Sequence, residues 1–458
     1  KNTIKIFSHK KIAGLITTGI SIFVIAMIIF GLIAIVRNFN LADIVFSFGK
    51  GLKTDSLGHT NILMAGIGGE SHDGADLTDT LLVASIDHEN KTITMLSIPR
   101  DLYVKGGKIK SGERINEIYF IAKNRFKSSS LGMEELKNVT AALTGTQIDY
   151  FIRIDFKSFK KVVDSIGGLN VMVEKDIYDP YYPLGETVQY QAFSIKAGFQ
   201  HIDGETALKY ARSRKTTSDF DRARRQQQLL TAIKEKAFNL NILTNSSKIQ
   251  EIHSAVNEGI ETDLSLNEII TLAKIAKDLK RENVHSFVLG DNPNECGGLL
   301  YTPAREFFNG AYVLLPAGNS YRDINIFTST IFDYPNITAE KNSIQILNGT
   351  KKPNIAAEVT NFLTRMCFNI IHYSNAENRN ITETTIYYRP GPNGEKPKSL
   401  GFLQKFLPFK TQSGIPSSYL NNEKKRQTAI VVELGEDYMQ KRVLDPFLNL
   451  SLLAPKTK

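Results

Sequence analysis

The stretch that decides the fold is "TLLVASIDHENKTITMLSIP", from Thr80 to Pro99. Two runs rich in Val, Ile, Leu and Thr flank the polar "HENK", and this composition favours two strands joined by a tight turn. A similar apolar run, "NILMAG" at Asn61 to Gly66, precedes them. The sequence therefore predicts a sheet that is built around an apolar hairpin.

Helical patterns alternate with short strands after this hairpin. Apolar residues recur at helical spacing in 134–143 and 158–166, and further helices are predicted over 222–238 and 266–280. The run "HSFVLG", from residue 285, reads as a later core strand. Alternating strands and helices over such a length predict an α/β or α+β sandwich.

The chain has 458 residues, which is more than one ordinary domain requires. The segment "DYPNITAEKNS" (333–343) breaks the pattern and reads as a linker. Beyond it, strand and helix signals in the order β-α-β-β indicate a second, small α/β domain. We place the domains at 57–335 and 336–440, with a tail at 441–458.

The N-terminal region predicts a membrane anchor. Residues 12–36 carry no charge, and at about 1.5 Å per residue they can cross a hydrocarbon core of roughly 30 Å. Lysines are concentrated before this run, so residues 1–11 are expected in the cytoplasm and the rest of the chain outside, after a spacer at 37–56. A cleaved signal peptide is the competing interpretation, but the run is long and no clear A-x-A site follows it.

Composition leaves several anionic partners open. The formal net charge is +9 and the pI is near 9.2, although 56 basic and 47 acidic residues form a broad mixture. Nucleic acid, anionic lipid and phosphorylated substrates are all compatible with this balance. The two cysteines, Cys296 and Cys367, fall in segments that we assign to different domains, so we expect free thiols.

Familiar catalytic motifs are missing. The run "GIGGES" (66–71) lacks the third glycine of a dinucleotide loop, and the chain has no phosphate-binding P-loop. It also has no G-x-S-x-G elbow and no H-E-x-x-H spacing. These absences disfavour nucleotide-binding, serine-hydrolase and zinc-hydrolase chemistry.

Carboxylates and an arginine follow the apolar strands instead. The loop "GGESHDGADLTDT" holds Asp73 and Asp79 among other acidic residues, and oxygen ligands on such a loop suit Mg²⁺, although an acidic turn is the simpler explanation of the loop alone. Arg100 comes directly after Pro99, at the end of a core strand. Sites in α/β folds favour strand ends, so Arg100 is a candidate site residue.

The densest charge lies in "YARSRKTTSDFDRARRQQQLL", from Tyr210 to Leu230. Stepping back along the apolar stripe of the helix predicted here places Gln226 and Arg222 on its buried side. An arginine on that side must be paired or must line a pocket, because an unpaired buried charge is very costly.

Three further residues of this stretch complete the candidate site. Asp219 lies three residues before Arg222 and can cap the helix or orient that guanidinium. Arg212 and Arg214, two apart in a segment that we expect to be extended, would share one face. Such planar donors bind phosphate oxygens bidentately, although a purely structural network of ion pairs is the alternative.

These motifs together resemble the LytR-CpsA-Psr family of bacterial envelope proteins. The resemblance rests on "TDTLLVASIDHENKTITMLSIPRDLYV", "RINEIYF", "IGGLNVMVEKDI" and "GFQHIDGETALKYARSR...DFDRARRQQQ", in the family's order, and covers about 57–335. Residues 341–439 resemble the small domain that often follows. The resemblance implies an α-β-α sandwich with a mixed central sheet.

The resemblance also implies an activity and a site. Family members are membrane-anchored phosphotransferases that move glycopolymers from a polyprenyl pyrophosphate carrier onto peptidoglycan or related wall sugars. The implied pyrophosphate ligands are Arg100, Arg212, Arg214, Arg222 and Gln226, with Asn116 nearby. Among these Arg100 and Arg222 are assigned catalytic roles, together with Asp219, which would orient the cluster. The polyprenyl tail would occupy an apolar tunnel in the sandwich.

The implied metal site departs from the family pattern. Asp79 matches the second of two aspartates that hold Mg²⁺, but Gly68 stands where the first is expected. Asp73 is our choice of substitute, with Glu70 and His72 as alternatives. The general base is left open between Asp79 and Asp219.

Two other functions remain open at this stage. A polyprenyl pyrophosphate hydrolase would use water as the acceptor, and a non-enzymatic envelope protein would bind lipid-linked precursors. A nucleic-acid-binding regulator is disfavoured, because the arginines gather at a helix start and a strand end and do not form a stripe.

Overall fold

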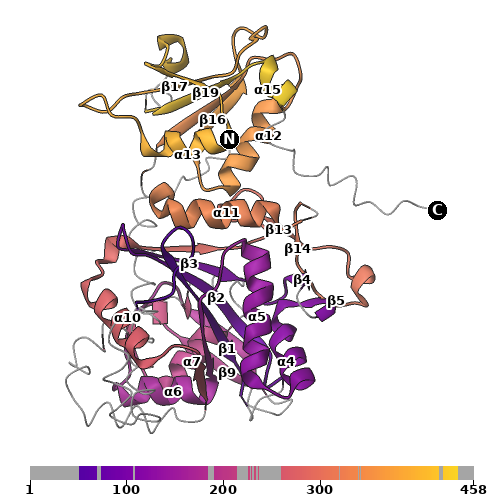
Figure 1. Ribbon diagram of the computed structural model, residues 1–458, viewed down its shortest axis with the longest axis vertical. Helices are drawn as coiled ribbons and strands as arrows, with labels where there is room; N and C mark the ends of the chain where they lie inside the picture. The colour runs from indigo at the N-terminus through magenta and orange to yellow at the C-terminus, as the bar shows by residue number, and fades with distance from the viewer. Residues whose placement is uncertain are drawn as a thin grey trace. The chain divides into compact units, whose positions relative to one another are not determined.

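The computed structural model describes most of the chain (Figure 1). The described residues are 51–69, 74–106, 109–183, 190–213, 259–318, 320–338, 340, 342–421 and 427–441, together with Arg225, Gln226, Gln228, Leu229, Ala232, Ile233 and Lys236. The chain divides into two compact units. The first comprises Lys1–Val288 and Arg305–Val313, and the second comprises Leu289–Ala304 and Leu314–Lys458.

The first unit is built on a six-stranded sheet with the order β11-β6-β1-β2-β3-β12. Its strands are β1 (His59–Ile67), β2 (Thr78–Asp87), β3 (Thr92–Ile98), β6 (Tyr150–Asp155), β11 (Ile260–Thr262) and β12 (Val284–Val288). The predicted hairpin is β2 and β3, which pair antiparallel in the middle of the sheet. β1 pairs parallel with β6 and antiparallel with β2, so the sheet is mixed, as predicted.

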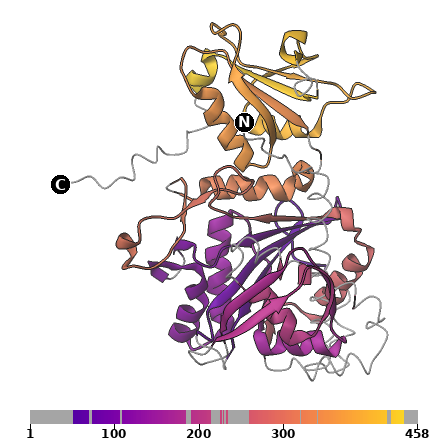
Figure 2. The same cartoon turned by 180° about the vertical axis from the view of Figure 1, so that it is seen from behind.

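Helices cover both faces of this sheet. The helices of the first unit are α4 (Ile115–Phe126), α5 (Ser129–Thr144), α6 (Phe156–Ser165), α7 (Gly204–Arg212) and α10 (Leu266–Asp278), with short 3-10 turns η2 (Arg281–Asn283) and η3 (Arg305–Phe308). On one face, α4 packs on β2 and α5 packs on β6. On the other, Ile62, Leu82 and Met95 of the sheet share one buried cluster with residues of α6, α7 and α10. This arrangement confirms the predicted α/β sandwich, and Figure 2 shows the face opposite to that of Figure 1.

A second feature of this unit is a long antiparallel hairpin. One arm contains β7 (Leu169–Val173) and β8 (Ile177–Pro183), and the other contains β9 (Tyr190–Ile195) and β10 (Gly198–Ile202). β7 pairs with β10 and β8 pairs with β9. Between these pairs, Asp176 accepts a hydrogen bond from the Ala197 backbone and forms an ion pair with Lys196. We call residues 169–183 and 190–202 the long hairpin; a smaller one joins β4 (Tyr103–Gly106) to β5 (Ile109–Arg114).

The strand directions bring several loops to one edge of the central sheet. β1, β3, β6 and β12 all run the same way, so their carboxyl ends meet at one edge, and β2 begins at that edge. Ligands of α/β proteins bind outside such carboxyl ends. This edge therefore collects the residues that follow Ile67, Ile98 and Asp155.

The second unit contains a five-stranded sheet with the order β16-β15-β19-β17-β18. Its elements are β13 (Leu300–Tyr301), β14 (Leu315–Pro316), α11 (Arg322–Asp333), η4 (Pro335–Thr338), β15 (Ser343–Asn348), α12 (Ile355–Arg365), β16 (Asn369–Asn375), β17 (Thr385–Tyr388), α13 (Lys398–Phe406), β18 (Lys410–Ser413), η5 (Ser417–Leu420), β19 (Ile430–Leu434) and α15 (Glu436–Lys441). The predicted β-α-β-β signals correspond to β15, α12, β17 and β19, and β16 was not among them. Residues 442–458 lie outside the described part of the chain.

The prediction of free thiols is wrong, because Cys296 and Cys367 form a disulfide. The sequence pattern assigns Cys296 to the first domain, whereas residues 289–304 belong to the second unit together with Cys367. Backbone contacts hold the same region: Gly297 donates to the carbonyl of Arg365, and Arg365 Nε donates to the carbonyl of Pro293. The boundary at 335/336 stays a prediction.

The predicted anchor at 12–36 lies outside the described residues, as do the flanking segments 1–11 and most of 37–56. Within the residues that the structure does describe, no helix combines the length and apolar character needed to cross a bilayer.

Candidate functional site

A cavity of about 120 Å³ lies between the central sheet and the helices that cover one of its faces. Cross-strand neighbours Met64, Gly66, Thr80, Leu82, Ser97, Ile152 and Ile154 line its sheet side. Phe156 and Phe159 of α6, Leu208 of α7 and Leu229 line its helix side. Apolar side chains dominate this lining, so the cavity suits an apolar ligand.

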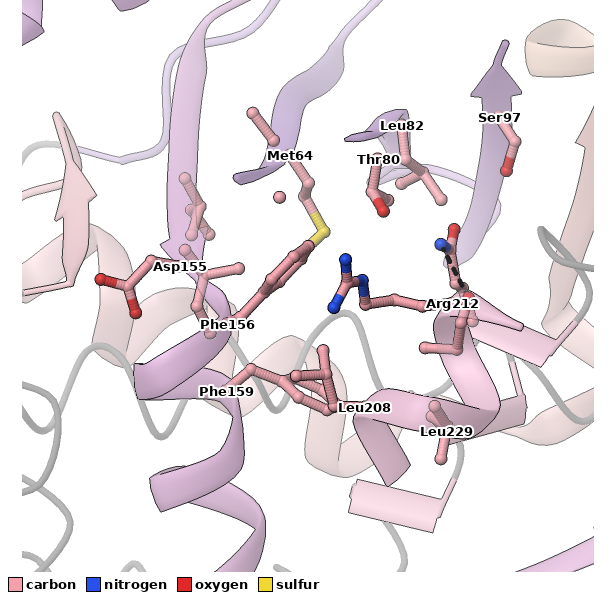
Figure 3. Close-up of a pocket in the computed structure, with 16 residues that line it drawn as sticks. Met64, Thr80, Leu82, Ser97, Asp155, Phe156, Phe159, Leu208, Arg212 and Leu229 are labelled. Atoms are coloured by element: carbon pink, nitrogen blue, oxygen red, sulfur yellow. Dashed lines mark hydrogen bonds between the residues drawn. The ribbon is translucent and has the colours of Figure 1, made fainter. Parts of the chain in front are cut away.

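Arg212 is the cation of this cavity, and Figure 3 shows its guanidinium pointing into the space beside Phe156. The guanidinium carbon lies 4.4 Å from the centroid of the Phe156 ring and 5.5 Å from that of Tyr182. Nη1 of Arg212 donates to the Tyr182 hydroxyl at 3.2 Å. Two aromatic rings therefore hold the planar cation, which leaves its edge directed at the cavity.

The local sequence explains why Arg212 stands there. Asp203 caps α7 by accepting a hydrogen bond from the Thr206 backbone, and Ala207, Leu208 and Ala211 form its buried side. Arg212 is the last residue of this helix. The prediction of an extended segment at Arg212 is wrong, because the helix of "GETALKYAR" reaches it.

A second arginine supports the end of α7 from the following helical segment. Arg225 is buried, and its Nε donates to the carbonyl of Tyr210 at 2.8 Å, while Nη2 donates to the carbonyl of Ser213. Gln226 lines the cavity, as predicted for the inner side of this helix, and its amide donates to the carbonyl of Ala211 at 3.4 Å. Both side chains thus attach this segment to the residues around Arg212.

A charged cluster lies at the carboxyl edge of the sheet. Asp79 adjoins Thr80 on β2, and Oδ1 of Asp79 accepts a hydrogen bond from Nη1 of Arg100 in a close ion pair. Asp101, which is buried, lies 3.5 Å from Nε of Arg100. Thr80 of β2 and Ser97 of β3 line the cavity, and Arg100 follows β3 by two residues, so the cluster and the cavity occupy the same edge region.

The start of α4 adjoins this cluster. The backbone of Asn116 donates to the carbonyl of Arg100 at 3.2 Å, and the buried Oδ1 of Asn116 has no hydrogen-bond partner within the described residues. Arg114 caps the helix with Glu117 and lies 3.8 Å from Asp101. The hydrogen bond to Glu117 is the main cause that raises the pKa of Arg114, so its charge is secure. Helix starts of this kind attract anions.

The structure describes the two ends of the acidic loop, up to Gly69 and from Gly74 onward. Gly69, at φ +86°, donates to the carbonyl of Ala75 and brings the two ends of the loop together. Asp76 forms an ion pair with Lys123 of α4 at 2.7 Å. Among the described residues no group of three or more His, Cys, Asp and Glu side chains could hold a metal ion. Asp79 remains as one carboxylate compatible with Mg²⁺, which usually takes one or two.

The structure places only part of the predicted site. It brings Arg100, Asp79 and Asn116 together, and it puts Arg212 and Gln226 on the cavity. Arg214, Asp219, Arg222 and Asp73, with Glu70 and His72, lie outside the described residues. The roles that we assign to all of these residues therefore stay predictions.

Sequence reasoning missed Tyr182, Phe156 and Arg225. Arg225 lies four residues before the buried Leu229, so the helical stepping that gave Gln226 could also have found it. Phe156 directly follows the strand end at Asp155 and could have been found from that position. Tyr182 carries no such signal, because its neighbour Tyr181 is equally aromatic and points outward.

Two family profiles match the sequence of this chain. The sequence profile of the LytR_cpsA_psr family matches residues 43–317. A second profile, described as LytR cell envelope-related transcriptional attenuator, matches residues 342–438.

Two relatives of similar sequence share one description. The polyisoprenyl-teichoic acid–peptidoglycan teichoic acid transferase TagV of Bacillus subtilis is 33% identical over 202 residues, covering 43% of this chain and 48% of that protein. The transferase of the same description named TagU, from Bacillus licheniformis, is 26% identical over 274 residues, covering 58% of this chain and 81% of that protein. The chain thus spans about half the length of TagV.

Among solved structures, the crystal structure of B. subtilis TagV is similar at a TM-score of 0.45 and 27% identity, covering 61% of this chain and 99% of that one. The family profile extends over the central sheet, the cavity and the charged cluster, and it includes more than half of the chain. The chain belongs to the LytR_cpsA_psr family.

Proposed function

We propose that this protein is a membrane-anchored phosphotransferase that moves a glycopolymer from a polyprenyl pyrophosphate carrier onto peptidoglycan or a related wall sugar. The names of its relatives describe transfer of teichoic acid from a polyisoprenyl carrier to peptidoglycan. The observation that carries the proposal is the apolar cavity with Arg212 at its wall. Such a cavity suits a molecule that joins a hydrocarbon chain to a phosphate.

The cavity supports the lipid part of this substrate. Met64, Leu82 and Ile154 on the sheet side face Phe159 and Leu229 on the helix side. An isoprenoid chain has no hydrogen-bonding groups, so burying it there gains about 25 cal/mol for each Å² of apolar surface removed from water. A ligand of this kind needs a polar anchor only at its head.

The cations support the pyrophosphate part. Arg212 reaches the cavity from α7, and Arg100 stands at the same sheet edge beside the start of α4. Arginine binds phosphate oxygens through two parallel N–H groups, which fixes orientation as well as charge. Asn116, at the same helix start, carries a side-chain amide whose N–H groups can donate to phosphate oxygens.

In the proposed reaction, a sugar hydroxyl of the acceptor attacks the phosphorus atom that bears the glycopolymer. A new P–O bond forms to the acceptor oxygen, and the bond to the bridging oxygen of polyprenyl phosphate breaks. The hydroxyl proton passes to a base, for which Asp79 and Asp219 remain the candidates. Arg100 and Arg212 stabilise the charge that develops on the transferring and leaving phosphates, and Arg222 would act with them.

We extend the proposal to Mg²⁺. Asp79 would hold the ion through a carboxylate oxygen, and Asp73 would supply a second carboxylate. When bound, the ion would neutralise charge on the pyrophosphate oxygens. Asp79 also pairs with Arg100, so this carboxylate would orient the guanidinium whether or not a metal is bound.

We also propose an extracytoplasmic location for both units, with the apolar run at 12–36 as the anchor. The disulfide between Cys296 and Cys367 supports an oxidising compartment, because such bonds persist outside the reducing cytosol. A lipid-linked donor would then reach the cavity from the membrane in which it resides.

The test is to incubate the full chain, in detergent, with a polyprenyl-pyrophosphate oligosaccharide and a peptidoglycan fragment. We expect release of polyprenyl phosphate together with a joined phosphodiester product, and about a 10²- to 10³-fold loss of this product with Arg212→Ala. Release with free sugar phosphate would mean hydrolysis instead. Tight carrier binding without any turnover would show a binding protein and end the enzymatic proposal.

A further inference from the structure

The outer face of the long hairpin exposes an unusual amount of apolar surface. Half of the large apolar side chains that stay exposed in the described part of the chain lie on this face, each between 53% and 67% exposed. They are Met172, Tyr178, Tyr181, Tyr190 and Phe199. Single exposed apolar residues are normal, whereas a row of them on one element indicates a binding surface.

The hairpin's alternation explains why these side chains cannot be buried. Val171, Val173 and Ile195 point inward and belong to the core cluster of the first unit. Their neighbours on each strand must point to the opposite face. The exposed row is therefore fixed by the same register that fills the core.

The row is organised in pairs along the hairpin. Met172 and Phe199 are direct cross-strand partners at one end. The rings of Tyr181 and Tyr190 meet edge to face at the other, with centroids 6.0 Å apart. Tyr178 lies between these pairs, opposite Ser194. From Met172 to Tyr181 the row extends for roughly 30 Å, at about 3.3 Å per residue.

Hydrogen-bonding groups accompany the apolar side chains on this face. Asn170 and His201 are exposed and hydrogen bond to each other at 2.7 Å. Ser194 is exposed on β9, opposite Tyr178. Aromatic faces flanked by amide, imidazole and hydroxyl groups suit a ligand with both C–H surfaces and hydroxyls.

The charge of the hairpin narrows the choice of ligand. Its charged side chains within the described residues are Glu174, Lys175, Asp176, Asp179 and Lys196. Asp179 is buried, so the exposed charges are two lysines and two carboxylates, and the hairpin offers a ligand no excess of positive charge. An anionic lipid surface or a polyphosphate-containing donor chain calls for basic side chains. A neutral polymer does not.

The shape of the hairpin favours a flexible linear ligand over a flat one. Two-stranded ribbons twist strongly, and the register shift between Asp179 and Tyr182 adds to this twist. A flat surface, such as a membrane, cannot contact both ends of a twisted ribbon at once. A flexible linear polymer can contact the whole length of the ribbon. The hairpin is the magenta ribbon toward the viewer in Figure 2.

The hairpin also contacts the arginine of the cavity. Tyr181 points outward, and the next residue, Tyr182, points inward and accepts the hydrogen bond from Arg212. A ligand on the outer face at Tyr181 is therefore one backbone step from a side chain that holds the cavity's arginine.

We propose that the outer face of the long hairpin, defined by Met172, Tyr178, Tyr181, Tyr190 and Phe199, binds the acceptor, an extended glycan strand of peptidoglycan. The proposal rests on the transfer function proposed above and deepens it. Sugar rings would stack on the aromatic side chains, and their hydroxyls would bond to Asn170, Ser194 and His201. The surface would hold a long acceptor beside the cavity and raise its local concentration there.

The experiment measures binding of the full chain, in detergent, to peptidoglycan sacculi stripped of attached polymers. The main variant combines Tyr178→Ser, Tyr181→Ser and Phe199→Ser, and we expect its apparent Kd to rise at least tenfold. The matched control is Phe307→Ser, which removes an equally exposed ring of the same unit outside the hairpin. The apparent Kd of this control should stay within twofold of that of the unmodified chain. A hexamer of N-acetylglucosamine should compete with the sacculi for the unmodified chain and for the control.

Polyprenyl pyrophosphate binding serves as the folding control, because the outer face does not touch the cavity. If the triple variant retains this binding and also retains sacculus binding, the proposal is overturned. The single variant Phe199→Ser, with an expected rise of about threefold, decides the question if the triple variant does not fold. Loss of binding to vesicles of phosphatidylglycerol and phosphatidylethanolamine, with sacculus binding unchanged, would identify a lipid surface and also overturn it.

Transfer activity separates this proposal from the proposed function. If the unmodified chain binds sacculi through the hairpin but transfers nothing, the transfer function fails and the glycan surface stands. If the triple variant transfers to long strands and to a single disaccharide as well as the unmodified chain does, the surface fails and the function stands. We expect a raised KM for long strands and an unchanged kcat.

Discussion

The guanidinium carbon of Arg212 lies 4.4 Å from the centroid of the Phe156 ring, at the wall of an apolar cavity. One residue ends a helix and the other begins one, so the contact joins α7 to α6 at the edge where the central strands end. It gives the cavity a cation whose plane is fixed before any ligand arrives.

Replacement of Arg212 tests how much its oriented guanidinium contributes to transfer. We expect Arg212→Ala to lower kcat by about 10²- to 10³-fold, and Arg212→Lys to restore only a small part, because a lysine has the charge without the planar donors. Transfer kinetics with a lipid-linked oligosaccharide measure this. Arg305→Ala is the matched control, since Arg305 contacts the Tyr312 ring in the same unit and does not line the cavity. Equal effects of Arg212→Ala and Arg305→Ala would count against the site.

Removal of divalent cations tests the proposed role of Asp79. Chelation with EDTA should abolish most of the transfer activity, and added Mg²⁺ should restore it. Asp79→Asn should raise the Mg²⁺ concentration needed for half-maximal activity by about tenfold or more, because one ligand loses its charge. Asp76→Asn, which breaks the ion pair with Lys123 on the same loop, should leave that concentration unchanged. Full activity in EDTA would rule out the metal.

The disulfide should contribute strongly to the stability of the second unit. Cys296 and Cys367 are 71 residues apart, and closing a loop of that length is worth about 4 kcal/mol in the chain-entropy description. We expect the Cys296→Ser, Cys367→Ser double variant to lose a large part of this contribution to the free energy of unfolding, as measured by urea denaturation. The chain has only these two cysteines, so thiol alkylation before and after reduction gives a direct count. Alkylation of the unreduced, oxidatively folded protein would contradict the bond.

His285 should make the first unit less stable in mild acid. Burial on β12 lowers the pKa of His285 to about 4, and its Nε2 has no hydrogen-bond partner among the described residues. In the unfolded chain His285 binds a proton at its ordinary pKa of about 6.5. Above that pH the imidazole is neutral in both states, so its burial does not reduce the free energy of unfolding. As the pH falls from about 6.5 to 4, the unfolded state binds the proton and the folded state does not, so the free energy of unfolding falls by about 3 kcal/mol at most. Unfolding free energies at pH 7.5 and 4.5 measure this.

The variant His285→Gln should remove that part of the pH dependence, since glutamine does not titrate. His201→Gln replaces an exposed histidine of the long hairpin and should leave the slope as it is. A slope that persists in His285→Gln would assign the acid sensitivity to other groups.

The strong local patterns predicted much of this fold. The apolar runs of β2 and β3, and the helical spacing of α6 and α10, come from burial on one side, which the sequence displays directly. The inward position of Gln226 follows from the same periodicity. The end of α7 was predicted wrongly because "YARSR" was interpreted without its upstream cap at Asp203, which starts the helix that carries Arg212.

Contacts between distant segments were harder to predict. The pairing of Cys296 with Cys367 depends on residues 289–304 joining the second unit, and this choice is made by tertiary packing and leaves no periodic signal. The same holds for Tyr182, whose inward direction depends on a register shift in the long hairpin. A one-residue slip in a strand exchanges its two faces, so sequence alone could not separate Tyr181 from Tyr182.

The buried guanidinium of Arg225 has an electrostatic consequence for ligand binding. The last carbonyl groups of a helix carry a partial negative charge, which repels an approaching anion. Arg225 donates to the carbonyls of Tyr210 and Ser213, at the end of the helix on which Arg212 stands. It thus screens that negative pole, so an anion at Arg212 would meet the cation's full attraction without the opposing field of the helix.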